Sequence, residues 1–386
     1  MDRRTFLGSV AALPLLAPAA LAAQTRGRIA GAPIRVEDGR LWIDVSFGGE
    51  GPFPFVIDTG APGNMIDDRL RRRLRLRELG RTRLRGVAGV QRFTFYEAPD
   101  VAYGPVRVGR IAFGAYGEEV RIHPRAHGLL SSGLLTAADA DLDFDIGLWV
   151  LHIDGRAAPP GYARLPSAIR DPEPGRGAAM IVVEAELDGR THRLIVDTGA
   201  PGQIMLGSDA SRRTGLWNDS TPFAPGRRRG IGGVGARSRL VRGGALRLGD
   251  LAFERPLVSL TEPGSPDLSG ADGLLGLELI ERLNLATRIG EGRLWAQRNA
   301  RPPRPERYGL SGLWLESRRD GGIEVAIVSP ASPAADAGLR VGDRLDGALG
   351  AWIARLGGRP GETIEIPYRR GGAADTARLT LREYLR

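Results

Sequence analysis

Apolar residues recur along the chain in short runs that are bounded by glycine, proline or aspartate. Residues 41–47, 180–187 and 192–197 are clear examples. Runs of this length between turn-forming residues are typical of β-strands. Helical periodicity is sparse, and we expect short helices only at 67–78 and 277–283. The pattern predicts a mainly β protein.

One hexapeptide, DTGAPG, occurs twice, beginning at Asp58 and at Asp197, and each copy follows an apolar run. The two aspartates are 197 − 58 = 139 positions apart. Four companion features keep the same order around each copy: a hairpin signal (48–51 and 188–189), a glycine-rich tip (86–90 and 230–235), a Gly-Leu-Leu segment (128–130 and 273–275) and a strand-like run (141–153 and 283–297). A repeat of this kind indicates two homologous lobes, at 27–157 and 176–300.

The remaining segments have different compositions. A proline- and glycine-rich stretch at 158–175 and the string ARPPRPER around 301–308 are predicted linkers, and 309–386 is predicted to be a separate small domain. Residues 1–23 combine Arg3 and Arg4 with an apolar run and small residues, which is the pattern of an export signal. The Arg-Arg-x-Phe-Leu string resembles the twin-arginine signal, which carries folded proteins. We therefore expect a periplasmic or secreted protein without a stable membrane anchor after cleavage.

Composition removes several kinds of chemistry. The 386-residue chain has no cysteine, which excludes disulfides, thiol nucleophiles and cysteine–metal sites. Its four histidines lack zinc-binding spacing, so we expect neither a metal nor a cofactor. All 54 basic residues are arginine and the net charge is +9, but the arginines are spread along the chain without interleaved aromatic residues. Nucleic acid is therefore not an expected partner, and we expect a monomer.

Two aspartates in matching positions suggest a reaction that needs neither a metal nor a thiol. One carboxylate can take a proton from water while a second carboxyl group protonates a substrate carbonyl oxygen. Such a pair must share one proton, because two adjacent carboxylates repel each other. Asp58 and Asp197 are the predicted pair. The hydroxyls of Thr59 and Thr198 could bond to the opposite backbone, and Gly60 and Gly199 would leave the carboxylates room.

The doubled Asp-Thr-Gly-Ala motif, with its glycine-rich tips and Gly-Leu-Leu segments, resembles the retropepsin and pepsin clan of aspartic peptidases. The resemblance covers residues 28–300 and implies two acid-protease-like β lobes related by a pseudo-two-fold axis. It implies that Asp58 and Asp197 are catalytic and that the substrate is a polypeptide. It also implies flaps that contact the substrate, formed by Val87, Ala88, Gly89, Gly232 and Gly233. One position departs from the pattern: Ser131 follows the first Gly-Leu-Leu segment, whereas Gly276 follows the second.

The C-terminal string SPASPAADAGLRVGDRL, at 329–345, resembles a bacterial PDZ domain. The resemblance implies a small α+β domain in which a peptide or a protein C-terminus adds as a strand beside a carboxylate-holding loop. Here the groove would include Leu310, Gly312 and Leu313. This loop departs from the usual glycine–hydrophobic–glycine–hydrophobic form, so a domain that only packs on the lobes is the alternative.

Two functions remain open from the sequence. The first is an aspartic endopeptidase that activates water between Asp58 and Asp197. The second is a non-catalytic peptide-binding protein that recruits a partner through its PDZ-like domain. Carboxyl groups within hydrogen-bonding reach favour the first function, and widely separated carboxyl groups favour the second.

Overall fold

The computed structural model describes residues 28–86, 89–117, 120, 122–170, 177–230, 233–266 and 270–386. The expected export signal (1–23) and the expected flap residues Val87, Ala88 and Gly232 lie outside the described residues. Among the helices of the described ranges, none has the length and apolar character that a membrane span requires.

The protein is mainly β, as the sequence predicts, and its two lobes repeat one sheet topology. In lobe 1 the strand order is β2-β3-β8-β4-β7-β6-β5, and in lobe 2 it is β13-β14-β21-β15-β20-β17-β16. The lobe 1 strands are β2 (Arg40–Phe47), β3 (Glu50–Ile57), β4 (Met65–Asp67), β5 (Arg77–Gly86), β6 (Gly89–Tyr103), β7 (Val106–Tyr116) and β8 (Gly128–Leu130). Their counterparts are β13 (Met180–Leu187), β14 (Arg190–Asp197), β15 (Ile204–Leu206), β16 (Ala224–Gly230), β17 (Gly233–Arg242), β20 (Leu257–Thr261) and β21 (Gly273–Gly276). In lobe 2, β18 (Ala245–Leu248) and β19 (Leu251–Glu254) are separate strands beside β13, whereas in lobe 1 the end of β6 makes the corresponding pairing with β2.

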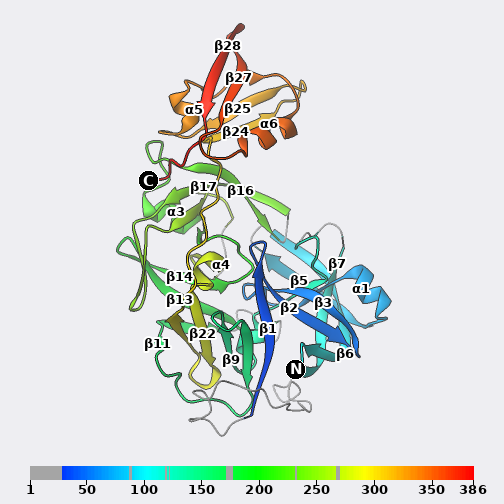
Figure 1. The fold of residues 1–386 in the computed structure, drawn as a ribbon. Coiled ribbons are helices and arrows are strands. Elements are labelled where there is room, and N and C mark those ends of the chain that lie inside the picture. Colours follow the sequence, from blue (N-terminus) through cyan, green and yellow to red (C-terminus); the bar gives the residue numbers. More distant parts are fainter. Residues whose placement is uncertain are drawn as a thin grey trace.

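A shared sheet joins the two lobes (Figure 1). It has the order β11-β23-β22-β9-β10-β1, where β1 (Ile29–Glu37) continues into lobe 1 by pairing with β2. Its other strands are β9 (Asp139–Asp143), β10 (Leu148–His152), β11 (Ala163–Arg164), β22 (Leu283–Arg288) and β23 (Arg293–Arg298). The two strand-like runs predicted to close the lobes are therefore hairpins. They meet where β22 pairs with β9, so both lobes share one hydrophobic core.

The predicted linker at 158–175 needs correction, because it is not free of regular structure. β11 lies within it and pairs with β23, and β12 (Ser167–Arg170) pairs with β13 of lobe 2. The sequence prediction followed the prolines and glycines of this segment. Isolated strands of two to four residues carry no periodic signal, and they form here because edge strands of lobe 2 offer them backbone partners.

The helices are few and shorter than predicted. The helix expected at 67–78 is α1 (Asp68–Arg73), capped by the Asp67 side chain; it stops before Arg75, which has a positive φ of 51°. The helix expected at 277–283 is α4 (Leu277–Ile280). In both places the chain is soon needed as a strand, β5 and β22, and tertiary pairing overrides helix propensity. The other lobe helices are α2 (Gly133–Thr136), α3 (Ser208–Thr214) and the 3₁₀ turn η2 (Ile289–Glu291).

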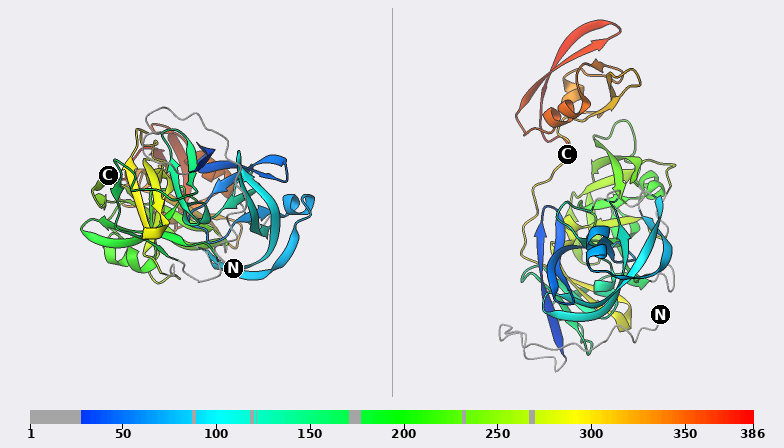
Figure 2. Two further views of the ribbon diagram at one scale, coloured as in Figure 1. Left: turned by 90° about the horizontal axis from the view of Figure 1, so that it is seen from below. Right: turned by 90° about the vertical axis from the view of Figure 1, so that its right-hand side faces the viewer.

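The C-terminal residues form a smaller unit with a core of its own, beyond one end of lobe 2 (Figures 1 and 2). Its sheet has the order β24-β25-β26-β27-β28. The strands are β24 (Leu313–Ser317), β25 (Ile323–Val328), β26 (Arg344–Leu345), β27 (Thr363–Arg370) and β28 (Ala373–Thr380), with helices α5 (Pro333–Asp336) and α6 (Leu349–Leu356). The segment 301–308 leads to it without helix or strand.

Candidate active site

Equivalent strands deliver the two aspartates to the junction of the lobes. Asp58 follows β3 directly, and Asp197 is the last residue of β14. Both strands end in buried apolar residues, and each pairs in parallel with the strand formed by its Gly-Leu-Leu segment, β8 or β21. The Asp58 backbone N–H donates to Leu130 O at 2.8 Å. Each carboxyl group is therefore carried by rigid sheet rather than by a mobile loop.

The two threonines lock the aspartate loops together across the pseudo-two-fold axis. The Thr59 hydroxyl donates to Val196 O at 2.6 Å, and the Thr198 hydroxyl donates to Ile57 O at 2.7 Å. Each hydroxyl also accepts the opposite threonine's backbone N–H, at 3.1 and 3.0 Å. Both threonines are fully buried. The reciprocal bonds that the sequence predicts are thus present, and they hold the two loops in one relative position.

The glycines of the two motifs allow the carboxyl groups to approach. A Cβ atom added to Gly60 would lie 2.3 Å from Asp197 Cγ, and one added to Gly199 would lie 2.3 Å from Asp58 Cγ. These separations are far below a van der Waals contact. Each glycine therefore lies directly against the carboxyl group of the other lobe, and no larger residue fits at either position.

The two carboxyl groups lie close enough to interact directly, so they form one titrating pair. Burial raises the pKa of Asp58 well above its ordinary value, and the charge of Asp197 raises it further. Burial also raises the pKa of Asp197, although backbone N–H groups of Gly199 and Ala200 and its bond with Asp58 oppose that rise. Both effects favour retention of a proton by the pair at a pH where isolated aspartates are ionised.

A cation beside the pair was missed by sequence reasoning. Arg40, the first residue of β2, donates from Nη1 to Gly199 O at 2.9 Å and lowers the pKa of both Asp58 and Asp197. Aligning the two repeats would have singled it out. Trp42 pairs with Val56, and Val182 pairs with Ile195; Val56 and Ile195 each stand two residues before their aspartate. Trp42 and Val182 are therefore equivalent positions, and so are Arg40 and Met180.

Both lobes resemble known proteins. Both lobes match the aspartyl protease family. The matched stretches are residues 43–135 and 183–279. No curated protein sequence is significantly similar to the chain. Solved structures that are similar include an aspartic proteinase from Irpex lacteus, with 13% identity and a TM-score of 0.41, covering 70% of this chain and 98% of that one. Basic 7S globulin from soybean has 10% identity and a TM-score of 0.43, covering 70% of this chain and 95% of that one. Conglutin gamma, a basic 7S globulin from lupine seeds, has 11% identity and a TM-score of 0.45, covering 71% of this chain and 96% of that one.

The residue that follows the Gly-Leu-Leu segment makes a different contact in each lobe. In lobe 1, Asn64 Oδ1 accepts the Ser131 backbone N–H at 2.9 Å and its hydroxyl at 3.1 Å. In lobe 2, Gly276 N donates instead to the backbone oxygen of Gln203 at 2.7 Å. A Cβ atom on Gly276 would lie 2.1 Å from Gly202 O. The serine is therefore a buried, bonded part of lobe 1, whereas lobe 2 has no space for one.

Each lobe carries a hairpin at its predicted flap. In lobe 1 the hairpin is β5–β6, whose last described pair is Gly86 with Gly89. In lobe 2 it is β16–β17, whose last described pair is Gly230 with Gly233. Gly89 and Gly233 therefore stand at the bases of the two tips. Substrate contact by the predicted flap residues stays a prediction.

The residues predicted to form a PDZ-like groove lie beside β24, the edge strand of the C-terminal sheet. Leu310 is half-buried, whereas Gly312 and Leu313 are buried, and the Leu313 side chain belongs to the domain core. Gly312 has a φ of 73°, and an added Cβ would lie 2.2 Å from Ser332 Cβ. Gly312 O already accepts the Ser329 N–H at 2.9 Å, and the Leu313 N–H donates to Ser311 Oγ at 3.2 Å. Ligand binding by this loop stays a prediction.

Proposed function

We propose that the protein is an aspartic endopeptidase. The observation that supports this most is the close approach of Asp58 and Asp197 at the meeting point of two interlocked loops. The family match of both lobes supports the same chemistry. Carboxyl groups that lie this close favour catalysis over simple peptide binding. The substrate is a polypeptide, and no cofactor takes part in the proposed reaction.

In the proposed mechanism the pair holds one proton and one negative charge. The ionised carboxyl group takes a proton from water as the water oxygen attacks the peptide carbonyl carbon, and the other carboxyl group donates its proton to the carbonyl oxygen. The resulting tetrahedral diol collapses when a proton passes to the amide nitrogen and the C–N bond breaks. A carboxylic acid and an amine leave, and the pair again holds one proton.

Digestion of a peptide library at pH 3 to 8, followed by mass spectrometry, tests this proposal. We expect internal cleavage that pepstatin inhibits and that both Asp58→Asn and Asp197→Asn abolish. Asp100→Asn, at an exposed position outside the site, is the matched control and should cleave normally. Wild-type protein that binds peptides but yields no products at any pH would instead support the non-catalytic peptide-binding function.

We propose that the C-terminal residues 309–386 act as a PDZ-like domain that binds a peptide or protein C-terminus along β24. The position of β24 at the end of its sheet, next to α6, supports strand addition there. We also propose export to the periplasm or the medium, with a monomeric mature chain. Binding of C-terminal peptides to the full-length protein, cell fractionation and sedimentation test these three statements separately.

A further inference from the structure

We propose that Arg40 is a fixed cation beside the catalytic pair, which favours ionisation of the two carboxyl groups and so sets the pH range of activity. This rests on the proposed function and assigns Arg40 as a positioning residue, because the contact that the structure shows is with the backbone of an aspartate loop. At the equivalent register position in lobe 2 the described residues place Met180, so the two-fold relation between the lobes is broken electrostatically at this position.

The geometry ties the guanidinium group to both aspartates through one residue. Arg40 Nη1 donates to Gly199 O at 2.9 Å. The N–H of that same Gly199 donates to Asp197 Oδ1 at 2.8 Å, and its Cα lies so close to Asp58 that an added Cβ would be 2.3 Å from Asp58 Cγ. A cation anchored on Gly199 therefore acts on both carboxyl groups rather than on one.

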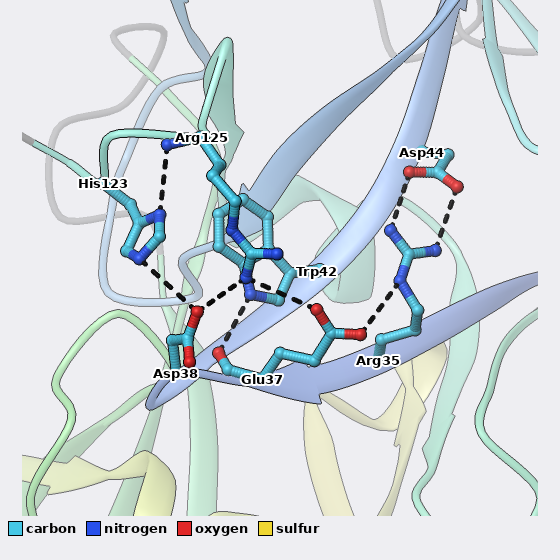
Figure 3. A network of polar contacts seen from close by, with 7 residues as sticks. All are labelled: Arg35, Glu37, Asp38, Trp42, Asp44, His123 and Arg125. Atoms are coloured by element: carbon cyan, nitrogen blue, oxygen red, sulfur yellow. Dashed lines mark hydrogen bonds and ion pairs between the residues drawn. The ribbon is translucent and has the colours of Figure 1, made fainter.

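The charge of Arg40 is not neutralised by another acid. Within the described residues, Arg40 forms no ion pair. The two acids of its own hairpin are engaged elsewhere: Glu37 pairs with Arg35 and Arg125, and Asp38 pairs with Arg125 (Figure 3). The catalytic pair is therefore the anionic partner that remains for Arg40.

The hairpin that carries Arg40 is held firmly in place. Trp42 is buried, donates its indole N–H to Glu37 O at 3.0 Å, and lies under the Arg125 guanidinium group (Figure 3). At the turn, an added Cβ on Gly39 would be 4.0 Å from Pro201 Cβ of the second aspartate loop. The turn thus packs against lobe 2, and Arg40 keeps its position without reordering during a reaction.

The equivalent position in lobe 2 shows which side chain the fold accepts in place of this cation. Met180 occupies the equivalent place at the start of β13 and packs with an apolar cluster that includes Ile195 and Met205. An unbranched apolar side chain is thus accepted at this position of the fold. Arg40→Met is consequently a substitution that the molecule itself has in its other half.

Other charged and titratable groups around the hairpin must be separated from Arg40 in any test. In the described residues they are Glu37 and Asp38 of the turn, His123 and Arg125 of the segment before β8, Arg304 after lobe 2, and the two catalytic aspartates. The ordinary pKa of His123 lies inside the pH range of the assay, and burial lowers that pKa. His123→Gln is therefore a necessary control.

The direction of the effect follows from the sign of the charges. A nearby cation stabilises each ionised carboxylate, so its removal makes both proton losses of the pair harder. A bell-shaped profile of kcat/KM reports these two proton losses in the free enzyme. Loss of the cation should therefore move both limbs of the profile to higher pH, without a change in the shape of the bell.

The experiment measures kcat/KM against pH on a peptide without ionisable side chains, for wild type, Arg40→Met, Arg40→Gln and Arg40→Lys. In the methionine and glutamine variants we expect both limbs of the kcat/KM profile to move to higher pH, by about half a pH unit or more. The glutamine amide can still donate a hydrogen bond, so it separates charge from bonding. Arg40→Lys and His123→Gln should stay close to wild type. A uniform loss of activity at every pH, with unmoved limbs, would mean that Arg40 is only structural.

A second measurement does not depend on cleavage. Because removal of Arg40 makes ionisation of the folded pair harder, Arg40→Met should lose thermal stability relative to wild type as pH rises from 4 to 7. In an Asp58→Asn/Asp197→Asn background this pH-dependent difference should vanish, because neither partner titrates any longer. An equal difference in both backgrounds would overturn the assignment. Failure of the wild type to cleave, with this pattern intact, would sink the proposed peptidase activity but not the role of Arg40.

Discussion

The two lobes have the same six-residue loop, the same strand order and the same threonine bonds, yet they differ just outside the carboxyl pair. Lobe 1 supplies Arg40 where lobe 2 has Met180, and Ser131 where lobe 2 has Gly276. The residues that touch both aspartate loops are symmetric because each must fit its own copy. Arg40 and Ser131 lie outside the two motifs and have different neighbours from Met180 and Gly276, and at these positions the lobes differ.

The hairpins of the two lobes differ in the same way. Phe223, just before β16, donates its N–H to Ser329 Oγ at 2.9 Å and accepts the Tyr384 hydroxyl at 2.8 Å. Arg227 on β16 pairs with Glu316 on β24 at 3.1 Å. In the described residues, the β5–β6 hairpin makes no hydrogen bond or ion pair with 309–386. The C-terminal domain therefore anchors the base of one hairpin and leaves the other independent.

The largest expected effect tests the symmetry at the centre. Asp58→Asn and Asp197→Asn should each lower kcat by about a thousandfold or more, and the double variant should be little worse, because the pair acts as a unit. Peptide cleavage assays measure this. A lobe whose aspartate can be replaced with only a small loss would show that the two halves do not share the chemistry.

The same variants carry a prediction about stability and pH. The pKa of Asp58 is raised in the folded state, so its contribution to stability is lost as pH rises from its ordinary value through the raised one. Asp58→Asn should therefore be a few degrees more stable than wild type at pH 7, with the difference disappearing near pH 3. Thermal unfolding at several pH values checks this, and an Asp58→Asn protein less stable at pH 7 would contradict it.

The next effect concerns the bonds between the loops. Thr59→Val and Thr198→Val should each lower the free energy of unfolding by about 2–4 kcal/mol, since a buried carbonyl and a buried N–H both lose their partner. The two losses should be similar if the junction is symmetric. Thr191→Val, at an exposed position on β14, is the control and should change little. Denaturant unfolding measures all three.

A smaller effect should separate the lobes. Gly276→Ser places a Cβ against Gly202 O and should cost about 1–3 kcal/mol through overpacking. The reverse change in lobe 1, Ser131→Gly, loses one side-chain hydrogen bond to Asn64 and should cost about 1 kcal/mol or less. Equal losses, measured by denaturant unfolding, would mean that the two positions are equivalent after all.

The smallest effect concerns the anchored hairpin. Tyr384→Phe removes the hydroxyl that reaches Phe223 O and should weaken the attachment by about 1 kcal/mol. Hydrogen exchange should quicken in β16–β17 and stay unchanged in β5–β6. Tyr368→Phe loses a comparable bond to Asp375 inside the C-terminal domain and is the matched control. Faster exchange in both hairpins, or in neither, would argue against a one-sided attachment.

Much of the fold could be read from the sequence because repeats and turn residues are local signals. The duplicated DTGAPG loops, their apolar strands and the Gly-Leu-Leu segments all indicate paired lobes before any contact is known. The short strands of 158–175 and the early ends of α1 and α4 could not be read. They depend on backbone partners that are distant in sequence, and propensity carries no information about such partners.

The candidate site shows the same division between local sequence signals and contacts between distant segments. By itself, the sequence determined which residues could form a carboxyl pair and which neighbours such a pair needs, since the doubled motif contains them all. Only the tertiary structure decided that Arg40 lies beside that pair, that Asn64 accepts hydrogen bonds from Ser131, and that the C-terminal domain contacts one hairpin. The reason is that electrostatic and packing effects act through space, between segments whose proximity exists only once the chain has folded.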